Sequence, residues 1–173
     1  MPYYEHLLQE MDIILTHDKT SWIGKAIAKF SSKLSHVNER VDHVTVYLGD
    51  NKIIESTNGG VRVRETKGYN PHNFVLYIAR YNNMTDDFKR VLKEKLLSKV
   101  GLKYSYFQLI LLLIKKIFNL KTVVDASTNA VVCSELVALA FEEAGKPIMD
   151  IPSHEFTPAD FFRAPNFTII RVF

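Results

Sequence analysis

The first half of the chain alternates between apolar and polar residues in several short segments. Four segments repeat with a period of two and are separated by Gly, Asn and Pro residues that favour turns. They span residues 43–48, 52–56, 61–65 and 74–80. A further short apolar segment covers residues 12–16. We therefore expect this half of the protein to be mainly β-structure.

One helix is expected within that half. Ser21 or Thr20 can cap its start, because both side chains can accept a hydrogen bond from the first turn. The apolar residues that follow recur at helical spacing, and they are Trp22, Ile23, Ala26, Ile27 and Phe30. The polar stretch 31–40 is expected to form a loop.

The second half of the chain has mainly helical spacing. Helices are expected from Thr85 or Asp86 to about Gly101, through the apolar segment 106–118, and from Cys133 to Gly145. A short helical turn at 157–162 and an edge strand at 167–172 follow. Strands followed by helices indicate an α+β fold, and we expect residues 1–173 to form a single domain.

Composition narrows the function classes. The chain has 173 residues, 47% of them hydrophobic, and a net charge of only +3, which is too small for a nucleic-acid surface. One cysteine excludes an internal disulfide and a Cys-rich zinc site, and no Walker loop, dinucleotide fingerprint or His-Glu-x-x-His motif is present. No cofactor, metal or nucleic-acid partner is therefore expected. No secretory signal is visible, so we expect a cytoplasmic protein.

The most hydrophobic segment, 106–118, has two interpretations. It is about half as long as the ~20 apolar residues that a membrane-spanning helix needs. A buried core helix is the first interpretation. The alternative is a peripheral contact with a membrane or a lipid chain, because Lys115 and Lys116 and the aromatic residues suit an interface.

A histidine and a glutamate are predicted to meet on the first hairpin. The valines and the leucine of segment 43–48 share one face, and the other face carries His43, Thr45 and Tyr47. A three-residue loop at 49–51 pairs Leu48 with Lys52 and places Thr45 opposite Glu55. Glu55 is then a diagonal neighbour of His43. A two-residue loop would instead bury the Glu55 charge among valines, so the register favours the His–Glu pair.

The only cysteine of the chain lies where an amphipathic helix is predicted to begin. Its apolar stripe points toward the sheet and comprises Cys133, Leu136, Val137, Ala140, Phe141 and Ala144. A helix N-terminus favours a thiolate, and its free N–H groups can hold an oxyanion. Cys133, His43 and Glu55 thus form a candidate nucleophilic triad.

Each triad residue also has a simpler interpretation. A lone cysteine on an apolar helix face is commonly an inert core residue, and His43 or Glu55 alone is an ordinary strand residue. Their joint placement favours the triad. His36 is an alternative base, but it lies in sequence that is typical of loops, and His154 is expected to be a turn residue.

These segments resemble a known family when they are taken in order. Residues 12–15, the string Asp42-His43-Val44-Thr45-Val46-Tyr47-Leu48-Gly49 and Ile53-Ile54-Glu55 resemble the histidine half of NlpC-type papain-fold cysteine hydrolases. Residues 101–104 and 133–137 resemble the cysteine half. The halves are in reversed order, as in the circularly permuted branch that includes YiiX-like proteins and lecithin:retinol acyltransferase-like enzymes. Residues 157–160 resemble the YiiX-like tail.

The resemblance implies a circularly permuted papain-like fold, with an antiparallel sheet or small barrel packed against helices. It implies that Cys133 is the nucleophile, His43 the base and Glu55 the orienting residue, with Tyr104 beside the substrate. Met11 and Asp42 depart from the family pattern, which usually has glycine and serine at these positions.

The function expected from the residues and the resemblance is hydrolysis of an amide bond in a peptide or peptidoglycan-like substrate. A lipid acyltransferase or thioesterase that uses the same triad on lipid amides or esters is the first alternative. A non-catalytic binding module on the same fold is the second.

Overall fold

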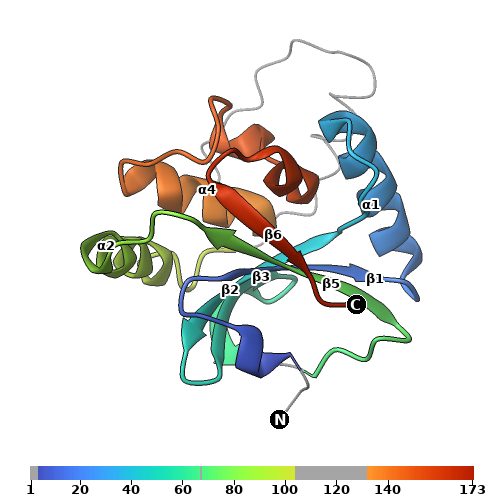
Figure 1. Ribbon diagram of the computed structural model, residues 1–173, viewed down its shortest axis with the longest axis horizontal. Helices are drawn as coiled ribbons and strands as arrows, with labels where there is room; N and C mark the ends of the chain where they lie inside the picture. The colour runs from blue at the N-terminus through green and yellow to red at the C-terminus, as the bar shows by residue number, and fades with distance from the viewer. Residues whose placement is uncertain (1–3, 67, 104–131) are drawn as a thin grey trace.

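The strands form one six-stranded antiparallel sheet in the order β4-β3-β2-β1-β5-β6. The computed structural model describes residues 4–66, 68–103 and 132–173 (Figure 1). The strands are β1 (Ile13–Asp18), β2 (His43–Gly49), β3 (Lys52–Thr57), β4 (Gly60–Glu65), β5 (Phe74–Tyr81) and β6 (Phe167–Arg171). The expected α+β class is confirmed. Within the described ranges β4 and β6 form the two edges, so the sheet is open there and not closed into a barrel.

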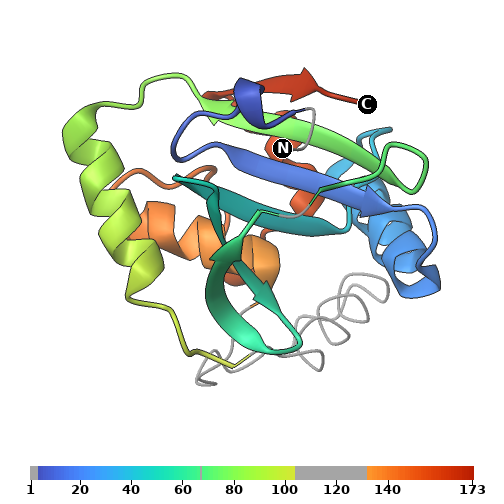
Figure 2. The same ribbon diagram turned by 90° about the horizontal axis from the view of Figure 1, so that it is seen from below.

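Helices cover mainly one face of this sheet. The helices are α1 (Trp22–Ser35), α2 (Asp86–Leu97) and α4 (Cys133–Glu143), and the 3₁₀ turns are η1 (Glu5–Leu7), η2 (Ser153–Glu155) and η3 (Pro158–Arg163). Figure 1 shows α1 and α4 on the same side of the sheet, with η1 on the opposite side. Figure 2 shows α1 and α2 at opposite ends of the sheet. The C-terminal turn and edge strand expected from the sequence correspond to η3 and β6.

The sheet has an apolar core on each face, as the alternation along its strands requires. The larger core lies against the helices and includes Val44 and Val46 of β2 together with Phe141 of α4. The smaller core is formed by Tyr4, Ile14, Ile53, Leu76 and Ile78. The predicted separation of the two faces of β2 is therefore confirmed.

The β2–β3 turn differs from the expected three-residue loop. Gly49, and not Leu48, pairs with Lys52. The turn itself is made by Asp50 and Asn51, whose φ angles are 49° and 58°. Positive φ at both central residues is the requirement of a two-residue type I′ turn, and Asp and Asn tolerate it better than most residues.

A β-bulge compensates for the shorter turn. The register shifts between Tyr47 and Gly49, so the bulge adds the residue that the turn leaves out. Thr45 consequently pairs with Glu55, as the sequence predicted. The predicted register at Glu55 is correct although the predicted turn is wrong, because the residue added by the bulge offsets the residue missing from the turn.

Helix α1 is longer than expected, and its buried face is not its apolar face. It continues through residues 31–35, which the sequence assigned to a loop, and ends at His36 in the left-handed conformation. Ser21 caps its start by accepting from Gly24 N at 3.0 Å, as one of the two predicted caps. The buried side of α1 carries small residues, which are Gly24, Ala28, Ser31, Ser32 and Ser35.

The start of β4 leaves no room for a side chain at Gly60. Its φ is +87°, and an added Cβ would lie 2.5 Å from the Leu102 carbonyl oxygen. Because the close atom belongs to the backbone, it has little freedom to move. We expect Gly60→Ala to lower the free energy of unfolding by about 2 kcal/mol or more through strained φ and overpacking.

Urea unfolding followed by circular dichroism measures this effect. Gly101→Ala is the matched control, since Gly101 also has positive φ (+93°) but has no neighbour within 4 Å of the added Cβ. Equal losses in the two variants would contradict a role for the Leu102 contact.

No helix within the described ranges is both long and apolar enough to cross a membrane. The apolar segment 106–118 lies outside those ranges, so neither interpretation of it is tested.

Candidate active site

His43 and Glu55 meet across the β2–β3 hairpin as predicted. The pairing of Thr45 with Glu55 makes Glu55 a diagonal neighbour of His43, and His43 Nε2 lies 3.2 Å from Glu55 Oε2. Glu55 is only 2% exposed, whereas the His43 side chain is partly exposed. A buried carboxylate on one ring nitrogen fixes the orientation of the imidazole and leaves Nδ1 available for another partner.

Two arginines that sequence reasoning missed hold the Glu55 carboxylate. Arg64 donates from Nε to Oε1 at 2.5 Å and from Nη2 to Oε2 at 2.9 Å. Arg62 donates to Oε1 at 3.3 Å. Both arginines come from β4, where Arg62 pairs directly with Glu55. The alternation in Val61-Arg62-Val63-Arg64, beside a strand with one acid, is the signal that could have found them.

This cluster keeps the buried glutamate ionised. Burial alone would raise the pKa of the Glu55 carboxyl. Hydrogen bonds from His43 and Arg64, together with their positive charges, outweigh burial and hold that pKa well below its ordinary value. Glu55 is therefore a fixed negative charge behind His43 at neutral pH.

Cys133 is the first residue of α4, as the sequence predicted. Helix α4 packs against β2 and β3, and the Cys133 side chain is buried. The preceding residue, Val132, has no side-chain oxygen to cap the helix, and the first helical hydrogen bond runs from Leu136 N to Val132 O. The N–H groups of the first turn are thus directed out of the helix end beside the thiol. Ser134 anchors this end by donating to the Phe156 carbonyl at 2.7 Å.

His43 lies between Cys133 and Glu55. Burial disfavours the imidazolium, but hydrogen bonds with the Cys133 side chain and the Glu55 carboxylate outweigh it and raise the pKa of His43 to about 10. Because Glu55 lies against Nε2, Nδ1 is the ring nitrogen left available for the cysteine. The structure therefore brings a helix-terminal thiol, an imidazole and a buried carboxylate together.

A pocket of about 390 Å³ opens beside His43 and Glu55. His43 and Glu55 are part of its lining, together with Asp18 and Asp42 and with the apolar side chains of Ile23 and Ile27 from α1. Polar groups on one wall and apolar groups on another suit a ligand with both characters.

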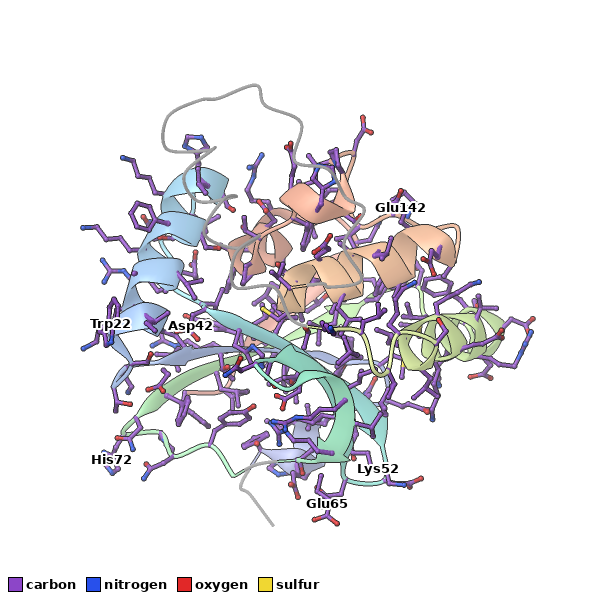
Figure 3. The ribbon with its side chains drawn as sticks, turned by 180° about the vertical axis from the view of Figure 1, so that it is seen from behind. Trp22, Asp42, Lys52, Glu65, His72 and Glu142 are labelled. Atoms are coloured by element: carbon purple, nitrogen blue, oxygen red, sulfur yellow. The ribbon has the colours of Figure 1, made fainter. Side chains whose placement is uncertain are left out.

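Asp42, which precedes His43, contacts the end of β1. Its Oδ2 lies 2.5 Å from His17 Nδ1 and accepts from Asp18 N at 3.0 Å. Burial raises the pKa of the Asp42 carboxyl despite these partners. Figure 3 shows Asp42 close to the end of α1 that carries Trp22.

The remaining predicted residues have other positions. His36 ends α1 as its C-cap, and His154 belongs to η2, where Nε2 lies 4.0 Å from Glu155 Oε1. Tyr104, the predicted substrate neighbour, lies outside the described residues. In the part of the chain that the structure describes, no group of three His, Cys, Asp or Glu side chains has a metal-binding arrangement.

No protein-family model matches the sequence. No curated protein matches it significantly.

Proposed function

We propose that the protein is a cysteine hydrolase that cleaves an amide bond through an acyl-enzyme, on a circularly permuted papain-like fold. The observation that carries the proposal is the placement of His43 between the Cys133 thiol and the Glu55 carboxylate. Cysteine hydrolases need this order of groups, because the base must both ionise the nucleophile and be oriented by a third group.

The proposed reaction begins with the Cys133 thiolate and the His43 imidazolium. The sulfur attacks the amide carbonyl carbon, and the developing oxyanion accepts hydrogen bonds from the first-turn N–H groups of α4. His43 then gives its proton to the leaving amine as the C–N bond breaks, which leaves a thioester on Cys133. Water attacks the thioester and His43 takes the proton of that water. The C–S bond then breaks, the acid product leaves, and the Cys133 thiolate and His43 imidazolium are restored.

Peptide or peptidoglycan-like amides are the proposed substrates, and this part of the proposal rests on the family resemblance alone. The lipid acyltransferase or thioesterase alternative uses the same three side chains. A panel of chromogenic anilides and thioesters distinguishes the two: cleavage of anilides supports the proposal, and turnover of thioesters alone supports the alternative. Cys133→Ser is the control for both.

The rate of Cys133 alkylation by iodoacetamide between pH 4 and 10 tests the catalytic pair directly. In the wild type we expect alkylation to persist well below the ordinary thiol pKa of about 8.5, because the neighbouring imidazolium and the helix end favour the thiolate. In His43→Ala, where only the helix end still favours the thiolate, we expect alkylation at pH 6 to be much slower.

His72→Ala is the matched control, since His72 is exposed in the turn before β5 and should leave the profile unchanged. An identical profile in wild type and His43→Ala would contradict the proposal. A thiol that reacts only after denaturation would do the same, and would favour the binding-module alternative.

A further inference from the structure

The packing of α1 leaves its large apolar residues outside both cores. Its buried side is held by serines: Ser31 Oγ accepts from Ala159 N at 3.0 Å, and Ser35 Oγ lies 3.0 Å from Thr157 Oγ1. Gly24 approaches Asp42 so closely that an added Cβ would lie 2.8 Å from its Oδ2. These contacts fix the rotation of α1 about its axis.

One flank of α1, beside its buried side, is apolar. Its large residues follow one another at helical spacing and are Trp22, Ile23, Ile27, Phe30 and Leu34. Trp22 is 79% exposed and Ile23 is 44% exposed, and the other three are partly exposed. None of the five belongs to either apolar core of the described residues. Figure 3 shows Trp22 projecting outward from the start of α1.

Three lysines border this apolar surface. Lys25, Lys29 and Lys33 are all exposed, and they follow one another at intervals of four residues. Residues 22–35 contain no acidic side chain. None of the three lysines forms an ion pair with another residue of the described chain. We call the five apolar residues and these three lysines the α1 outer face.

We propose that the α1 outer face docks on an anionic lipid membrane, with Trp22 and Ile23 inserted among the headgroups and the lysines against the lipid phosphates and carboxylates. An apolar strip flanked by lysines and led by an exposed tryptophan is the pattern of helices that lie in the plane of a membrane interface. Its unpaired positive charge selects an anionic surface over a neutral one.

Docking in this orientation has a consequence for the pocket beside His43. Ile23 and Ile27 belong both to the α1 outer face and to the pocket lining. The pocket therefore opens next to the proposed membrane surface. Membrane docking itself does not depend on the proposed hydrolase activity, and it is measured without a substrate.

Trp22 is the only tryptophan of the chain, so its fluorescence reports on this face alone. The full chain is mixed with vesicles of phosphatidylcholine containing 30% phosphatidylserine, and with vesicles of phosphatidylcholine only. With the anionic vesicles we expect co-flotation, a blue shift of Trp22 emission, and protection of Trp22 from acrylamide. We expect much weaker effects with neutral vesicles or in 0.5 M salt, because salt screens the lysines.

Variants separate the two parts of the surface. Replacing Lys25, Lys29 and Lys33 together by glutamine should lower the partition coefficient on anionic vesicles on the order of a hundredfold, at about fivefold for each lysine. Lys52→Gln is the charge control, since Lys52 lies at the far end of the molecule from Trp22 (Figure 3). Ile23→Ser should weaken binding, whereas Leu97→Ser on α2, which replaces a side chain 41% exposed, should not.

Three results would overturn the proposal. The first is vesicle binding without a change in Trp22 emission, which would assign the contact to another surface. The second is unchanged binding of the triple lysine variant. The third is a Trp22 that acrylamide cannot quench even without vesicles, which would mean that another segment or a second copy of the chain covers this face.

Discussion

Replacing Arg64 by methionine is expected to lower the free energy of unfolding by about 3 kcal/mol at neutral pH, the usual cost of removing one partner of a buried ion pair. Arg64 makes the two shortest contacts with the Glu55 carboxylate, and its side chain is only 17% exposed. Methionine keeps the aliphatic stem but leaves a buried negative charge with fewer donors. Urea unfolding at pH 7 measures the loss.

The pH dependence of the stability lost in Arg64→Met identifies the cause of that loss. In the wild type the pKa of Glu55 is depressed, so its ionised form stabilises the fold above the ordinary value of 4.5 and this contribution is lost as the pH falls. Without Arg64 the pKa of Glu55 should rise. The difference in stability between the two proteins should therefore be largest at neutral pH and shrink below about 4.5.

Arg62→Met is the matched control for this experiment. Arg62 makes a single contact at 3.3 Å and its side chain is 49% exposed, so solvent screens its interaction with Glu55. We expect a loss below about 1 kcal/mol. A loss in Arg64→Met that does not change with pH would show that packing, and not the ion pair, is what the substitution removes.

Replacing Phe141 by alanine is expected to cost about 3–5 kcal/mol, the range for a large aromatic side chain in a core. The Phe141 ring is fully buried, and its centroid lies 5.6 Å from those of Phe88, Phe167 and Tyr81. It therefore joins α4 to α2, β5 and β6. Guanidinium unfolding gives the loss directly.

Leu139→Ala is the control on the same helix. Leu139 is only partly buried at the border of the larger core, so its truncation should cost clearly less. Because Phe141 fixes the helix that begins at Cys133, Phe141→Ala should also loosen the position of the thiol beside His43. Equal stability losses in the two variants would contradict the central position of Phe141.

The His43–Glu55 pair could be predicted because strand alternation and the avoidance of a buried, unpaired charge both act locally. The turn between their strands could not. Asp50 and Asn51 can form either a two-residue turn with a bulge or part of a longer loop. The local backbone conformation decides between the two, and the apolar pattern does not predict it. The two solutions give the same register at Glu55.

The buried side of α1 could not be predicted from its apolar spacing. Serine hydrogen bonds to residues 157–160 and the tight approach of Gly24 to Asp42 determine which side packs, and these contacts join segments far apart in the sequence. The role of Arg64 was missed for a related reason. A strand with alternating charged residues normally indicates a solvated face. The pairing of β4 with β3 shows that the Arg64 guanidinium instead binds the buried Glu55 carboxylate.

The position of β4 at the edge of the sheet also affects the tendency of the protein to aggregate. Edge strands offer unpaired backbone groups to other chains, and charged side chains are a common protection against such pairing. Arg62 and Arg64 lie on this edge, with the partly exposed Val63 between them. The backbone of Val61 already pairs with Gly101 and Leu102, and we expect the two arginines to discourage pairing of another chain with the rest of β4. Loss of their charge would affect solubility at high concentration as well as stability.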